Sequence, residues 1–186
     1  MKRIIAVLCA LFFLTGCTGH QEELDRAMSL RAKLLSREGV TFDATVTADY
    51  GDQTYTFSMR CKTDNQGNLG FTVTAPESIA GITGTVSATG GKLTFDEKAL
   101  SFELMADDQL SPVSAPWVLI RTLRSGYLTS CALEDGLVRV AIDDSYADDA
   151  LHLDIWLDEQ DLPKHADILW DGRRLLSIEV TNFAFL

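Results

Sequence analysis

Residues 40–50 read VTFDATVTADY, and an apolar or aromatic side chain stands at every second position of this stretch. The residues between them are threonine or aspartate. Successive side chains of a strand point to opposite faces, so this alternation predicts a β-strand with one apolar and one polar face. The same period returns in residues 54–61, TYTFSMRC, after a turn at Gly51 and Asp52. The two runs therefore predict an antiparallel hairpin.

Runs with the same period continue to the end of the chain and bring the expected number of strands to about eleven. Glu134-Asp135-Gly136 and Asp171-Gly172 are expected at hairpin turns, because Asp-Gly pairs readily adopt the left-handed backbone of tight turns. The further expected strands cover residues 69–75, 82–88, 92–95, 100–104, 127–133, 138–142, 151–157, 166–170 and 176–185.

Two segments break the β pattern and predict helices. Residues 18–21, Thr-Gly-His-Gln, fit a capping box and begin a run with apolar residues at helical spacing. Gly39 is expected to end this helix in the left-handed conformation. The prolines and the spacing of apolar residues in 112–124 predict a short second helix.

So many one-sided strands need a cover for their apolar faces. A single sheet curled around the two helices would provide it, and so would a two-layer sandwich. The 186 residues show no internal repeat and no compositional boundary beyond the N-terminal segment, so residues 23–186 are expected to form one mainly β domain.

The first seventeen residues have the layout of an export signal. A basic pair at residues 2–3 precedes an apolar run over residues 4–14, and two small residues then lead to Cys17. The sequence Leu-Thr-Gly-Cys at 14–17 resembles the bacterial lipobox, in which the cysteine carries a thioether-linked diacylglycerol. This resemblance implies a signal peptide over 1–16 and a lipidated tether over 17–22, whereas an ordinary signal peptide with an incidental cysteine is the alternative.

The anchor and the charge of the chain limit its partners. Two acyl chains on Cys17 would hold the protein stably at a membrane, on the extracytoplasmic face or at an outer membrane if the host has two. No other apolar run approaches the ~20 residues of a helical span, so the body is expected to be soluble. With 27 acidic and 16 basic residues the net charge is −11, which excludes a nucleic-acid partner.

Two cysteines remain beyond Cys17, namely Cys61 and Cys131. Their number and spacing exclude a C-x-x-C redox pair and a four-ligand zinc site. In an oxidising compartment they could form a Cys61–Cys131 disulfide, or they could remain two buried thiols.

The sequence offers no catalytic constellation. The three histidines, His20, His152 and His165, accompany no H-E-x-x-H, G-x-S-x-G or phosphate-binding glycine motif. The acidic pairs at 143–144 and 148–149 lack the spacing of a calcium loop and are interpreted as a solvated connection. We therefore expect no enzymatic activity, no cofactor and no metal.

Large apolar side chains of the expected strands and second helix could line a lipid cavity or simply pack a core. The ten candidates for a cavity lining are Phe42, Val46, Tyr55, Phe57, Phe71, Val73, Ile82, Phe102, Trp117 and Ile120.

Residues 71–82 read FTVTAPESIAGI: a strand reaches a proline, and a short turn with an aliphatic residue and a glycine leads to another strand. This segment resembles the LolA/LolB-like lipoprotein carriers and receptors. Residues 82–95 and the terminal strand 177–183 continue the likeness. The resemblance implies an incomplete, strongly curved antiparallel β-barrel with the two helices as a lid over an apolar cavity for acyl chains.

Two functions from different classes follow from these observations. The first is a membrane-anchored lipoprotein that binds or passes a lipid or other apolar ligand between a curved sheet and its helices. The alternative is a non-enzymatic interaction module of a cell-envelope assembly, with a solid core and a protein partner.

Overall fold

The computed structural model describes residues 21–186 except for residues 52, 107 and 108. In this part of the chain eleven strands form one open antiparallel sheet in the order β6-β5-β4-β3-β2-β1-β13-β12-β11-β10-β9. The sheet does not close, so β6 and β9 are its edges. This arrangement confirms the predicted single curved sheet, whereas the two-layer sandwich is wrong.

The long strands at the two ends of the chain, β1 and β13, pair with each other in the middle of the sheet. The helices and strands in chain order are α2 (Gln21–Ser36), β1 (Val40–Asp49), β2 (Thr54–Thr63), β3 (Leu69–Ala75), η1 (Glu77–Ile79), β4 (Thr83–Ser87), β5 (Gly90–Phe95), β6 (Lys98–Phe102), β7 (Met105–Ala106), β8 (Gln109–Leu110), η2 (Pro112–Ser114), α3 (Ala115–Ser125), β9 (Tyr127–Glu134), β10 (Leu137–Asp143), β11 (His152–Leu157), β12 (Pro163–Trp170) and β13 (Arg173–Phe185).

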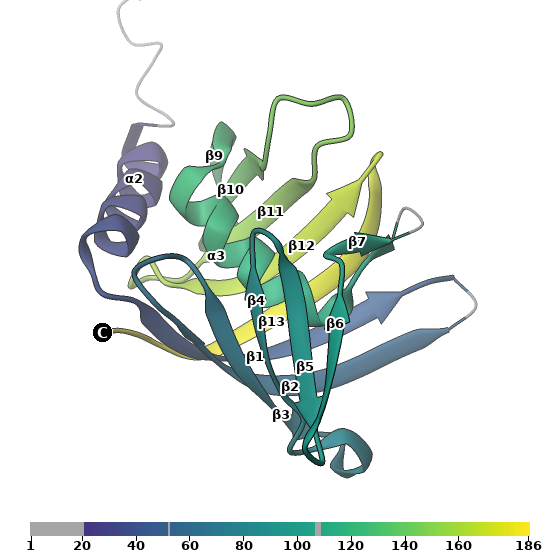
Figure 1. The fold of residues 1–186 in the computed structure, drawn as a ribbon. Helices are drawn as coiled ribbons and strands as arrows, with labels where there is room; N and C mark the ends of the chain where they lie inside the picture. The colour runs from purple at the N-terminus through teal and green to yellow at the C-terminus, as the bar shows by residue number, and fades with distance from the viewer. Residues whose placement is uncertain (1–20, 52, 107–108) are drawn as a thin grey trace, which may run out of the picture.

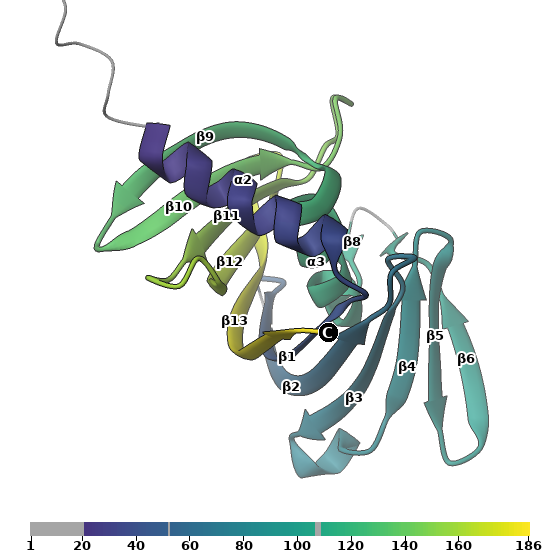
Figure 2. The same ribbon diagram turned by 90° about the vertical axis from the view of Figure 1, so that its left-hand side faces the viewer.

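Strong curvature gives the sheet two wings, one of β9–β13 and one of β2–β6 (Figures 1 and 2). Helix α3 lies on the concave side between them, and α2 crosses over β9 and α3. Among the described residues, no helix is both long and apolar enough to cross a membrane.

Strand β1 shows why these residues form the centre of the sheet. Its apolar positions, from Val40 through Phe42 to Ala48, are buried on the concave side. The threonines between them stay half-exposed on the convex side, where Thr45 bonds to Ser58 of β2 at 2.9 Å. The period of two therefore divides core from solvent as the sequence predicts.

The two Asp-Gly turns form as predicted. Asp135 and Gly136 have φ values of 51° and 83°, and Asp171 and Gly172 have 49° and 72°. Positive φ at both central residues is the geometry of the hairpin turns whose twist matches the flanking strands.

The boundaries of the first helix differ from the prediction. The expected capping residue Thr18 lies outside the described residues, and α2 ends at Ser36 rather than at Gly39. Gly39 is not left-handed. A Cβ atom there would lie 2.1 Å from the carbonyl oxygen of Thr63, so glycine is required for the close approach of the chain to β2. The small β7–β8 pair was not predicted either.

Candidate functional site

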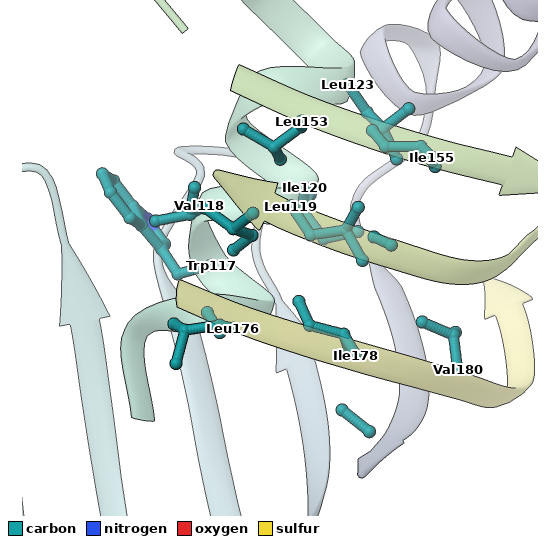
Figure 3. Packing of buried hydrophobic residues seen from close by; sticks show 14 of the residues in the cluster. Trp117, Val118, Leu119, Ile120, Leu123, Leu153, Ile155, Leu176, Ile178 and Val180 are labelled. Carbon is teal, nitrogen blue, oxygen red and sulfur yellow. The ribbon is translucent and has the colours of Figure 1, made fainter. Parts of the chain in front are cut away.

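Helix α3 fills much of the concave side. Nearly all of its residues are buried, and only Arg121, Arg124 and Ser125 are not. Figure 3 shows Leu119 and Leu123 directed toward the strands of the β9–β13 wing, whereas the Trp117 side chain lies on the other side of the helix. There the indole Nε1 of Trp117 donates a hydrogen bond of 2.8 Å to the carbonyl oxygen of Gly67, in the β2–β3 loop.

A pocket of about 370 Å³ opens beside this tryptophan. It lies between α3, the end of α2, the β2–β3 loop and the β4–β5 turn. Its floor is apolar and its rim carries two guanidinium groups. The lining residues are Leu35, Gln66, Gly67, Asn68, Ala88, Trp117, Ile120, Arg121, Arg124 and Ser125.

The two arginines of the pocket make few polar contacts with the rest of the described chain. The guanidinium carbon of Arg121 lies 5.2 Å from the centre of the Trp117 ring, a cation–π contact. Arg124 reaches the carbonyl oxygen of Asn65 with a long contact of 3.4 Å. Within the described part of the chain, neither guanidinium lies within 4.0 Å of a carboxylate. Both arginines therefore keep hydrogen-bond donors for another group.

A second apolar surface covers the concave face of β4–β6. Leu93 of β5 pairs with Leu100 of β6, and Phe95 follows Leu93 on the same face. Leu100 is 64% exposed and Phe95 is 54% exposed, while Ile82 and Phe102 are half-buried. Helix α3 does not reach this outer end of the wing (Figure 2). The protein thus leaves large apolar side chains uncovered on the side of the sheet where its core lies.

The ten predicted lining residues do not all lie together around the pocket. Of these, Trp117 and Ile120 line it. Tyr55 is half-exposed on β2, and Ile82 and Phe102 are half-buried on the β4–β6 face. The remaining five are buried in the packed core, and these are Phe42, Val46, Phe57, Phe71 and Val73.

Sequence reasoning missed the two arginines and the β2–β3 loop. Trp117, Arg121 and Arg124 are spaced four and three residues apart, which places them on one face of a helix. That spacing could have indicated a basic helix face next to an aromatic residue. The sequence could not have shown that residues 66–68 line the pocket, because only the fold brings this loop next to α3.

The structure has Cys61 and Cys131 as free, buried thiols, which is one of the two alternatives that the sequence left open. Cys61 lies on β2 and Cys131 on β9, and five strands separate these two in the sheet. Burial raises the pKa of both thiols. They are therefore poor nucleophiles at neutral pH.

A half-buried arginine joins the two helices. The Nε of Arg31 on α2 donates a hydrogen bond of 2.8 Å to the carbonyl oxygen of Leu123, near the end of α3. Burial lowers the pKa of this guanidinium. Its Nη2 atom is buried without a hydrogen-bond partner among the described residues. The contact holds the end of α3 against α2 beside the pocket.

Of the histidines, His152 and His165 belong to polar networks on the β10–β13 part of the sheet and not to the pocket, and His20 lies outside the described residues. His165 bonds to Glu179 at 2.8 Å and to Asp167 at 3.2 Å, and Arg174 contacts Asp167 at 3.3 Å. The Asp167 hydrogen bond raises the pKa of His165 against the opposing effect of burial, and the bond to Glu179 adds to it. The described residues contain no group of three or more potential ligands for a metal ion.

This network predicts a pH-dependent stability. Because the folded state raises the pKa of His165, its contribution is fully present below the unfolded pKa of about 6.5 and is lost as the pH rises through the folded pKa. The free energy of unfolding should therefore fall as the pH rises above about 6.5. We expect this fall to be smaller in His165→Gln, measured by urea unfolding. An unchanged profile in His165→Gln would contradict the prediction.

Together these features define a class of protein: an open, curved antiparallel sheet with a helix on its concave side and uncovered apolar surface beside it. Solved structures of similar fold include a putative outer membrane lipoprotein-sorting protein domain from Vibrio parahaemolyticus, with 11% identity, a TM-score of 0.48 and coverage of 87% of this chain and 91% of that one. An uncharacterized conserved protein from Thermus thermophilus has 14% identity and a TM-score of 0.46, with coverage of 89% and 86%.

A LolA superfamily protein from Nitrosomonas europaea also resembles the chain, with 9% identity, a TM-score of 0.44 and coverage of 86% of this chain and 93% of that one. No family model and no curated protein matches the sequence. The likeness to the solved structures is one of fold alone.

Proposed function

We propose that this chain is an envelope lipoprotein that binds one lipid or other apolar ligand on the concave side of its sheet, without covalent chemistry. The observation that carries the proposal is the uncovered apolar face of β4–β6, with Phe95 and Leu100 more than half exposed. Contiguous apolar surface of this kind marks a binding site in soluble proteins.

Burial supplies the binding free energy in this proposal. Each 100 Å² of apolar surface removed from water contributes roughly 2.5 kcal/mol. An acyl chain laid along Leu93, Phe95 and Leu100 would cover their exposed faces and lose its own contact with water. The ligand needs no displacement of α3, whose buried residues fill the other part of the concave side.

The proposed protein is attached to the membrane through its lipidated N-terminus. Residues 1–16 would be removed as a signal peptide, and residues 17–22 would be the tether with diacylglycerol on Cys17. An extended chain spans at most about 3.6 Å per residue, so a tether of four residues between Gln21 and Cys17 could reach no further than about 14 Å. The start of α2 and the β11–β12 turn, joined by the Arg26–Asp161 ion pair of 2.5 Å, would therefore lie close to the bilayer.

The sheet offers a matched pair of leucines to test the ligand site. Leu100 on edge strand β6 is 64% exposed, and Leu133 on the opposite edge strand β9 is 61% exposed. The full chain is expressed in a bacterial host and purified, and its bound lipid is counted by native mass spectrometry and extraction. We expect Leu100→Asp to lose most of the lipid and Leu133→Asp to retain it.

The same experiment decides against the alternative of a solid-cored interaction module. A wild-type chain without bound lipid, beyond its own anchor, would contradict the carrier and support the module. Equal retention of lipid by Leu100→Asp and wild type would place any ligand away from β4–β6.

A further inference from the structure

We propose, on the basis of the lipid-binding function above, that the ligand is an anionic lipid whose headgroup occupies the pocket at α3. Arg121 and Arg124 are its cationic contacts. The acyl chain leaves the pocket along the concave face of β4–β6.

The charge of the pocket favours an anionic headgroup. The chain has a net charge of −11, yet the rim of this pocket presents two guanidinium groups with no carboxylate within 4.0 Å among the described residues. The nearby Asp64 carboxylate accepts hydrogen bonds of 2.9 Å from the backbone of Gln66 and Asn68 and from the Asn68 side chain, within its own turn. Guanidinium groups bind phosphate and carboxylate oxygens with paired donors.

The size of the pocket favours a headgroup with part of one acyl chain. A volume of about 370 Å³ lies near the lower end of the range of ligand pockets, about 300–1,000 Å³. It suits a headgroup and the upper part of one chain, rather than a whole lipid with two chains. The indole of Trp117 is fixed by its bond to Gly67 and holds Arg121 over its ring. The pocket therefore combines an apolar floor with a preset position for at least one cation.

The pocket is continuous with the apolar concave face of β4–β6. Ala88, in the turn between β4 and β5, lines the pocket. From Gly91 strand β5 runs to Phe95, and its concave side carries Leu93 next to Leu100 of β6. At about 3.3 Å per residue, the four steps from Gly91 to Phe95 span about 13 Å. A chain that starts between the arginines can thus reach the exposed end of the wing.

The test places the full chain in phosphatidylcholine vesicles that contain a small fraction of a photoactivatable lipid. One probe has a phosphatidylglycerol headgroup and the other a phosphatidylcholine headgroup, with the same diazirine-bearing acyl chain. We expect about tenfold more cross-linking with the anionic probe, as charge-assisted hydrogen bonds would give. The cross-linked peptides should contain residues of β5 and β6.

Arg121→Gln/Arg124→Gln should lower the cross-linking of the anionic probe to the level of the neutral one. Arg37→Gln/Arg173→Gln, which changes the net charge equally at exposed arginines outside the pocket, should keep the preference. Thermal unfolding checks that both variants fold. If the pocket variant is unfolded, Arg121→Lys/Arg124→Lys replaces it and should weaken the anionic preference, because the paired donors are lost.

The outcomes separate the two proposals. Equal cross-linking of both probes, unaffected by the pocket variant, overturns the headgroup site and leaves lipid binding intact. Cross-linking of neither probe to β5 and β6 overturns the lipid site on β4–β6, on which the proposed function rests. Full displacement of the anionic probe by millimolar inorganic phosphate, but not by palmitate, overturns the lipid as the source of the anion.

Discussion

Replacement of Leu119 by alanine should lower the free energy of unfolding by about 2 to 5 kcal/mol. Leu119 is fully buried in α3 and belongs to the core that joins the helix to the strands. Leu176 and Ile178 of β13 belong to the same buried cluster. The sheet cannot close around the void, because α3 is held by the bond from Trp117 at one end and from Arg31 at the other. Urea unfolding at constant pH measures the change.

Leu133→Ala is the matched control, since it removes the same atoms from an exposed site. We expect it to change the free energy of unfolding by about 0.5 kcal/mol or less. A loss below 1 kcal/mol in Leu119→Ala would show that α3 does not pack in the core as described.

Gly39→Ala should cost about 2 to 3 kcal/mol, although it adds a single methyl group. The new Cβ would lie 2.1 Å from the carbonyl oxygen of Thr63 and 3.0 Å from its carbonyl carbon. These are backbone atoms, so the start of β1 must move away from the end of β2. The movement would strain the 2.9 Å hydrogen bond from the Val40 amide to the Thr63 hydroxyl and the bond from the Leu186 amide to Gly39.

Gly70→Ala offers the same chemical change where there is room. The nearest atom to its Cβ would be the carbonyl oxygen of Lys62 at 3.9 Å, an ordinary contact, and its φ is not positive. We expect a change within about 0.5 kcal/mol. The difference between the two variants in thermal or urea unfolding measures the close approach at Gly39, and equal effects would refute that account.

The strands could be predicted from the sequence because one face of the sheet is buried and the other is exposed to solvent. In β1 the alternation between residues such as Phe42 and Thr41 follows from that difference alone. The turns at Asp135-Gly136 and Asp171-Gly172 were readable for a local reason, namely the left-handed backbone they need. In β4–β6 the exposed side chains Phe95 and Leu100 look like core residues in the sequence, because an uncovered apolar face has the same pattern as a covered one.

Contacts between distant segments could not be predicted in the same way. The packing role of Gly39 depends on Thr63 at the end of β2, which lies twenty-four residues later in the chain. Nor could the sequence place Cys61 and Cys131 with five strands between them, because the order of the strands depends on pairing between distant segments.

The amino-acid sequence by itself determined the strands, the two helices, the acidic charge and the predicted anchor at Cys17. These depend on local periodicity and composition, which act over a few residues. Only the tertiary structure decided where the concave face stays uncovered and that Arg121 and Arg124 meet the β2–β3 loop around one pocket. Burial and proximity are properties of the packed chain, because they depend on which distant segments exclude water from each other.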